Sequence, residues 1–145
     1  MRSDFAAGRL PGTQAGVSGT ERDYEPGVCN IGPDEIARRR RAGHVGLLVA
    51  VVVLAAVVAI GAPPPARLIV GLPVAGAASG YLQAWLKFCA GFGSRGLFNF
   101  GPVGETRQVE APEARTRDRA RARQIGLASL ATGIVAAVVA VLLPL

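Results

Sequence analysis

Half of the 145 residues are hydrophobic and only 18% are charged, which is unusually apolar for a soluble domain of this size. The formal net charge of +6 is compatible with nucleic-acid binding, but the basic residues stand at the ends of long apolar segments, where a membrane-topology signal belongs. We therefore expect a membrane protein with no nucleic-acid partner. The arginine-rich, lysine-poor composition indicates a bacterial source.

The first 27 residues show no hydrophobic periodicity and are rich in small and polar residues, which predicts a disordered tail. They contain no apolar run of signal-peptide length, so the first span should serve as an uncleaved anchor. We expect residues 28–145 to form one membrane domain and no second folded unit.

A helix is predicted to begin near Pro33, a residue that suits a first helical turn. Asp34 and Glu35 follow and favour the positive end of the helix dipole. This amphipathic or interfacial helix should continue into a first span at about 45–62. A tight, proline-rich turn (63–67), expected to be extended, makes the first two spans an antiparallel hairpin.

The second span, at about 68–90, is the most informative one, because it carries small, polar and aromatic residues in separate stripes. Small residues spaced by four let helices approach closely, and polar residues in a span are costly when they face lipid. The predicted helix-packing interface is Gly76, Ser79, Gly80, Gln83 and Ala84. This face could pack inside the monomer, contact another chain or line a pore.

A cytoplasmic loop is expected at about 91–124, with a charged helix from Pro112 leading into a third span at about 125–144. The N-terminal segment, the loop and Lys87 just before it together hold fifteen of the sixteen basic residues, which predicts that this side is cytoplasmic. The predicted location is the bacterial cytoplasmic (inner) membrane, with the N-terminus inside and the C-terminus outside. Anionic lipid headgroups are expected partners, and the predicted interfacial anchors are Arg38, Arg39, Arg40, Arg41, Tyr81, Trp85, Lys87 and Arg95.

No catalytic group can be assembled from the sequence, so we expect neither an enzyme nor a cofactor. The glycines at 91, 93 and 96 match a dinucleotide-binding spacing, but no strand precedes them. Cys29 and Cys89 are weak candidates for a redox or metal pair, because no Cys-x-x-Cys is present. His44 is expected to be an interfacial residue rather than a ligand.

The words Cys29-Asn30-Ile31-Gly32, Phe88-Cys89-Ala90-Gly91-Phe92-Gly93 and Gly96-Leu97-Phe98-Asn99-Phe100-Gly101 resemble a family of small bacterial three-span membrane proteins. The resemblance covers about residues 24–145 and implies no activity, cofactor or site. It marks these words as the segments to follow.

The sequence thus predicts an all-α integral membrane protein with three transmembrane helices. Its expected role is that of a non-enzymatic accessory or scaffold subunit, packed against other membrane subunits or a second copy of itself. One alternative is a membrane-surface redox or metal-binding protein that uses Cys29 and Cys89. The other is a small oligomeric channel or carrier, with Ser79 and Gln83 facing its lumen.

Overall fold

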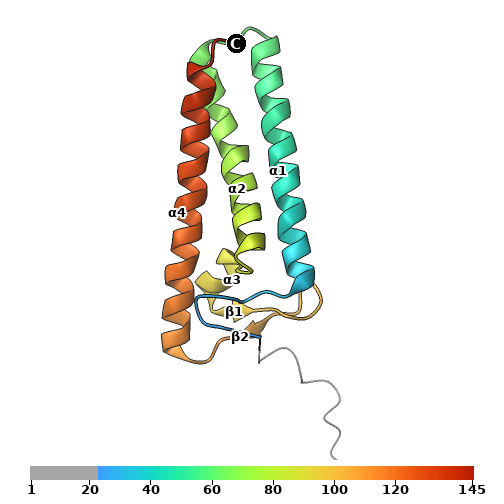
Figure 1. The fold of residues 1–145 in the computed structure, drawn as a ribbon, viewed down its shortest axis with the longest axis vertical. Coiled ribbons are helices and arrows are strands. Elements are labelled where there is room, and N and C mark those ends of the chain that lie inside the picture. Colours follow the sequence, from blue (N-terminus) through green and yellow to red (C-terminus); the bar gives the residue numbers. More distant parts are fainter. Residues whose placement is uncertain (1–22) are drawn as a thin grey trace, which may run out of the picture.

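The computed structural model describes residues 23–145 and is mostly helical (Figure 1). The predicted tail therefore lies outside the described residues, apart from its last five. In chain order the elements are α1 (Pro33–Ala59), the 3₁₀ helix η1 (Pro64–Val70), α2 (Gly71–Trp85), α3 (Ala90–Arg95), β1 (Leu97–Phe98), β2 (Arg107–Gln108) and α4 (Pro112–Leu142).

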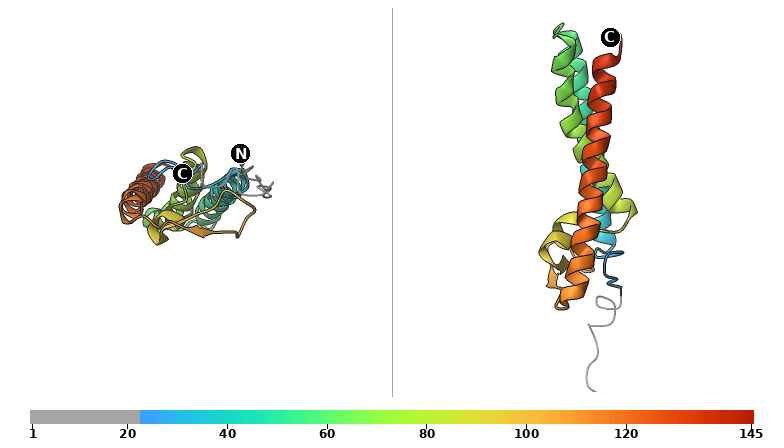
Figure 2. Two further views of the ribbon diagram at one scale, coloured as in Figure 1. Left: turned by 90° about the horizontal axis from the view of Figure 1, so that it is seen from below. Right: turned by 90° about the vertical axis from the view of Figure 1, so that its left-hand side faces the viewer.

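Three long helical segments lie side by side, with α2 between α1 and α4 (Figures 1 and 2). Within the described residues, three helices are long and apolar enough to cross a membrane: Pro33–Ala59, Pro64–Trp85 and Pro112–Leu142. Their large apolar side chains point outward, as Val52 does at 58% exposure and Leu72 at 75%. Such a surface suits a lipid environment.

The outer two helices are longer than a bilayer core requires. At 1.5 Å per residue, α1 is about 40 Å long and α4 about 46 Å, against a core of about 30 Å. The additional length is the charged N-terminal part of each helix, which lies at the same end of the bundle as α3 and the strands (Figure 1). These parts together form a small polar cap, which comprises residues 23–44 and 86–124.

Glycines allow the three helices to touch through their backbones. A Cβ atom on Gly80 would lie 2.5 Å from the Gly43 nitrogen, so α1 and α2 are in backbone contact there. On the other side of α2, a Cβ on Gly133 would lie 2.5 Å from the Gly71 oxygen. Both interfaces of α2 therefore depend on the absence of a side chain.

The proline-rich turn differs from the extended turn expected from the sequence. Pro64 and Pro65 open η1, which continues directly into α2. The first turn of a helix needs no backbone N–H donors, so prolines are accommodated there. Arg67 is 5% exposed and its guanidinium donates to the oxygens of Leu143 and Leu145, both at 2.8 Å, and so holds the chain end after α4.

The second helix ends at Trp85, five residues before the end of the predicted span. Lys87 has a positive φ of 53°, and the Phe88 nitrogen donates back to the Gln83 oxygen at 3.0 Å. This is a Schellman-type helix ending, with lysine at the position that glycine usually takes. The turn buries Phe88 completely, in a cluster with Ala122 and Ile125 of α4.

The cap contains strand pairing that an all-α prediction lacks. β1 and β2 are antiparallel, and Ile31 forms a parallel bridge with Asn99 beside them. Beneath them, Phe98, Val109 and Ala114 form a second small core. Residues 23–27, predicted as part of the tail, belong to the cap because Tyr24 packs against this core and stacks on Phe98.

Candidate functional site

The predicted packing residues of α2 lie on more than one face. Gly80 and Ala84 are buried, and Gly80 meets α1. Gly76 is exposed, and a Cβ placed there would meet nothing within 4 Å. The Gly76-x-x-x-Gly80 pair is therefore divided between an internal contact and an open surface.

The two polar residues of α2 are bonded to the protein itself. Gln83 is 8% exposed; its Nε2 donates to Ser79 Oγ at 2.7 Å and its Oε1 accepts from the Ala90 nitrogen at 3.0 Å. The second bond ties α2 to the start of α3. Gln83 thus fixes the turn between these helices, a structural use of a buried amide.

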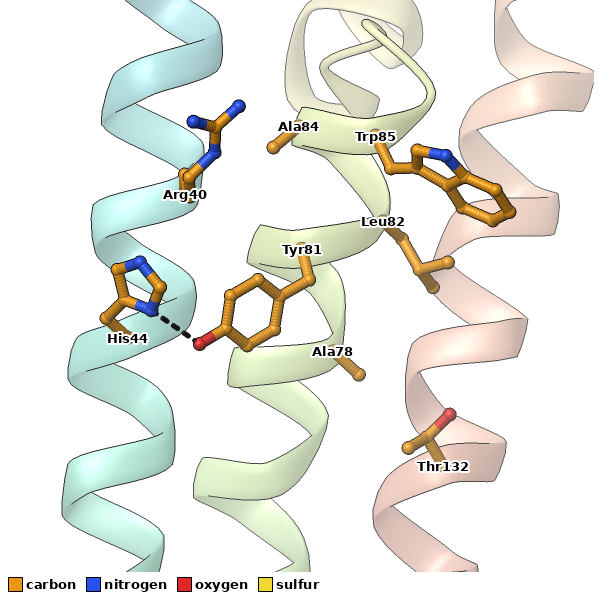
Figure 3. Close-up of a pocket in the computed structure, with 8 residues that line it drawn as sticks. All are labelled: Arg40, His44, Ala78, Tyr81, Leu82, Ala84, Trp85 and Thr132. Carbon is orange, nitrogen blue, oxygen red and sulfur yellow. Dashed lines mark hydrogen bonds between the residues drawn. The ribbon is translucent and has the colours of Figure 1, made fainter.

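On another face of α2, where the cap meets the apolar part of the bundle, there is a cleft of about 560 Å³ (Figure 3). All three long helices contribute to it. Its lining residues are Arg40, His44, Ala78, Tyr81, Leu82, Ala84, Trp85 and Thr132.

Polar groups are gathered at one end of this cleft. Arg40 lies at the cap end, with His44 one turn further along α1 (Figure 3). His44 Nδ1 is 2.7 Å from Tyr81 Oη, and the two rings meet edge to face. Deeper in the cleft the lining consists of small or apolar groups such as Ala78 and Leu82. The cleft is therefore amphipathic along its length.

The other predicted anchors have different surroundings. Trp85 is 80% exposed, and Arg41, Lys87 and Arg95 are also exposed. The exposed Arg38 lies 3.6 Å from Glu35. Arg39 instead turns inward: its guanidinium donates to Cys89 Sγ at 2.9 Å and lies 5.8 Å from the centre of the Phe92 ring.

The two cysteines are free, Cys29 half-buried and Cys89 buried. Burial raises the pKa of the Cys29 thiol, which disfavours the reactive thiolate. Cys89 Sγ accepts from Arg39 and from the Phe92 nitrogen. Within residues 23–145, no three His, Cys, Asp or Glu side chains are grouped as a metal ion would require.

Asn30 joins the segments around Cys89 through every polar group it has. Its side chain donates to the Cys89 oxygen at 3.1 Å and accepts from the Cys89 nitrogen at 2.6 Å. Its backbone bonds to the Lys87 oxygen and the Asn99 nitrogen. The three sequence words that contain Asn30, Cys89 and Asn99 thus meet in space, with Asn30 as the common partner.

Two buried acids also hold the cap, a role that the sequence analysis gave to neither of them. Glu35 is fully buried and accepts from Asn99 Nδ2 at 3.4 Å. Asp118 is fully buried and accepts from Tyr24 Oη at 2.7 Å and from the Gly27 nitrogen at 2.8 Å. Burial, together with the bond to Asp118, raises the pKa of Tyr24 well above its usual range.

One signal in the sequence could have identified Asp118. It is an acid among arginines, and it continues a stripe of small residues along α4, between Ala114 and Ala122. That stripe is the buried face of the helix, so an acid within it must be buried too. Arg67 could have been noticed in a similar way, because it is the only basic residue in the turn 63–67 and a lone charge there suggests a specific partner.

No protein-family model, curated protein or solved structure matches this chain.

Proposed function

We propose that this protein is a non-enzymatic accessory or scaffold subunit of the bacterial cytoplasmic membrane, which binds a transmembrane helix of another subunit or of a second copy. The open surface around Gly76 is the observation that carries this proposal. Partner binding there needs no rearrangement of the three helices.

The geometry around Gly76 supports a contact of this kind. Other glycines in the spans, among them Gly46, Gly71 and Gly133, would each bring a Cβ within 3 Å of a neighbouring helix. Gly76 has no such neighbour, although it lies near the middle of the Pro64–Trp85 segment. Leu72, one turn away, is 75% exposed and lines a shallow groove of about 170 Å³ between α2 and α4. A small residue beside a groove allows a transmembrane helix of another chain to pack closely against α2.

The proposed orientation puts the cap in the cytoplasm and the C-terminus outside. It is supported by the charge asymmetry, since basic residues near span ends are retained in the cytoplasm. Among residues 23–145, Arg67 is the one basic residue at the opposite end, and it is buried against the carbonyl groups that follow α4. Its position therefore has a structural explanation and does not oppose the rule.

The proposal is tested by Gly76→Leu, with co-purification from native membranes after mild crosslinking as the readout. We expect the variant to fold and insert normally but to lose its crosslinked partner, because the new side chain occupies the contact surface. The matched control is Gly126→Leu in α4, another exposed glycine without a neighbour within 4 Å. Unchanged association of Gly76→Leu, or equal loss in both variants, would contradict the proposed surface.

A further inference from the structure

We propose that the cleft between α1, α2 and α4 binds one anionic phospholipid, with its phosphate on Arg40 and His44 and an acyl chain along the apolar floor. This inference depends on the chain crossing a membrane. It does not depend on the existence of a protein partner, and its test is independent of the Gly76 surface.

The depth of the cleft matches the position of a phosphate group. The uncharged run of α1 begins at Val45, which places the edge of the hydrocarbon core near that residue. Arg40 precedes it by five residues, or about 7 Å along the helix. The headgroup region of each leaflet is about 5–7 Å deep. The guanidinium of Arg40 therefore lies at headgroup level, and His44 lies at the boundary.

The charge at the mouth of the cleft is available for an external anion. Among the described residues, the side chain of Arg40 forms no hydrogen bond and no ion pair, whereas the neighbouring Arg39 side chain bonds to Cys89 and lies 3.7 Å from Glu35. When Tyr81 donates to His44 Nδ1, the neutral imidazole carries its proton on Nε2, which remains free to donate. An arginine fork and a second donor make a suitable receptor for phosphate oxygens.

The rest of the cleft suits a hydrocarbon chain. Ala78 and Leu82 line its floor, and Thr132 stands at its deeper part. The Thr132 hydroxyl donates to the Ala128 oxygen at 2.8 Å. The hydroxyl therefore needs no partner from the cleft, and the methyl group of Thr132 can contact an acyl chain. Trp85 forms the rim, where an indole favours the membrane interface. The volume of about 560 Å³ is within the range of ligand-binding pockets.

A lipid is favoured over other occupants by the combination of these features. A soluble phosphate would use only the mouth and leave the apolar floor empty. A partner helix would bring apolar side chains against the unpaired charge of Arg40, which is unfavourable. A phospholipid satisfies both ends, because its charged and apolar parts are at the depths where the cleft has them.

The test is native mass spectrometry of the full-length protein, released from nanodiscs of phosphatidylcholine with a minor fraction of phosphatidylglycerol. We expect one phosphatidylglycerol to be retained per chain, in preference to phosphatidylcholine. Arg40→Gln should reduce this retention about fivefold, since one arginine near the membrane surface contributes about that factor. Ala78→Phe, which fills the floor and keeps the charge, should also reduce it.

Arg41→Gln is the matched control, because Arg41 is the adjacent, exposed arginine and does not line the cleft. It should retain lipid as the unmodified chain does. Equal losses from Arg40→Gln and Arg41→Gln would overturn the proposal in favour of diffuse surface attraction. Equal retention of both lipids, or displacement of the lipid by millimolar inorganic phosphate, would overturn it as well.

Discussion

Gly80→Leu is expected to separate α1 from α2 and to lower the free energy of unfolding by about 3 kcal/mol, at the upper end of typical overpacking effects. A Cβ at this position would already lie 2.5 Å from the Gly43 nitrogen and 2.8 Å from the Arg39 oxygen. Both are backbone atoms, so no side chain can rotate away to make room. Thermal and denaturant unfolding in detergent micelles, followed by circular dichroism, would measure the loss.

Gly76→Leu is the control for this experiment, since it makes the same change one helical turn away in open space. Its effect on unfolding should stay within about 0.5 kcal/mol. The two variants therefore separate the internal from the external half of the small-residue pair. If Gly80→Leu were as stable as the unmodified chain, the backbone contact between α1 and α2 would be wrong.

Asp118→Ala is expected to release the N-terminal segment of the cap. The change removes the acceptor for Tyr24 Oη and for the Gly27 nitrogen. Hydrogen bonds to a buried carboxylate are strong, and the donors left behind lose their partner, so we expect a cost of about 3 kcal/mol. Limited proteolysis should then cleave between residues 23 and 32, whereas the same segment should resist cleavage in the unmodified chain.

Glu113→Gln is the matched control for Asp118→Ala. Glu113 is an acid of the same helix, but it is exposed. Its replacement removes a favourable interaction with the helix dipole and should cost less than about 1 kcal/mol. Protection of the cap in Asp118→Ala, or equal release in both variants, would show that the buried carboxylate does not hold this segment.

The apolar segments could be predicted because they depend on composition over many residues. The third span and the charged helix before it were expected to be continuous, and α4 is one helix from Pro112 to Leu142. The long apolar runs of α1 and α4 likewise required no knowledge of tertiary contacts. The position of a long apolar helix depends on the hydrophobic pattern of its own residues, which can be identified directly from the sequence.

The end of α2 could not be predicted in the same way. The residues from Leu86 to Ala90 are compatible with a longer apolar helix, and the chain turns at Lys87 because Phe88 is buried against α4. That contact joins residues more than thirty positions apart. The tertiary gain outweighs the local preference of lysine against a positive φ.

The faces of α2 were only partly resolved by helical periodicity. The spacing of four residues places Gly76, Gly80 and Ala84 on one side of the helix. That spacing does not show whether a single neighbouring helix covers all three residues. In the structure α1 covers Gly80 and leaves Gly76 open.

The cap could not be predicted because its hydrogen bonds join residues from separate segments. Asn30, Asn99 and Asp118 are far apart in the sequence, and their bonds form only when these segments are assembled.

The proposed lipid site, the partner surface and the orientation of the cap all depend on three membrane crossings. The most direct measurement is labelling of single cysteines with a membrane-impermeant maleimide, in a Cys29→Ser background that retains the buried Cys89. Ala66→Cys, in the exposed turn at one end, should react in intact spheroplasts, and Val103→Cys, in the exposed cap loop, only after lysis. Labelling of Val103→Cys from outside, or of both positions from the same side, would contradict the account.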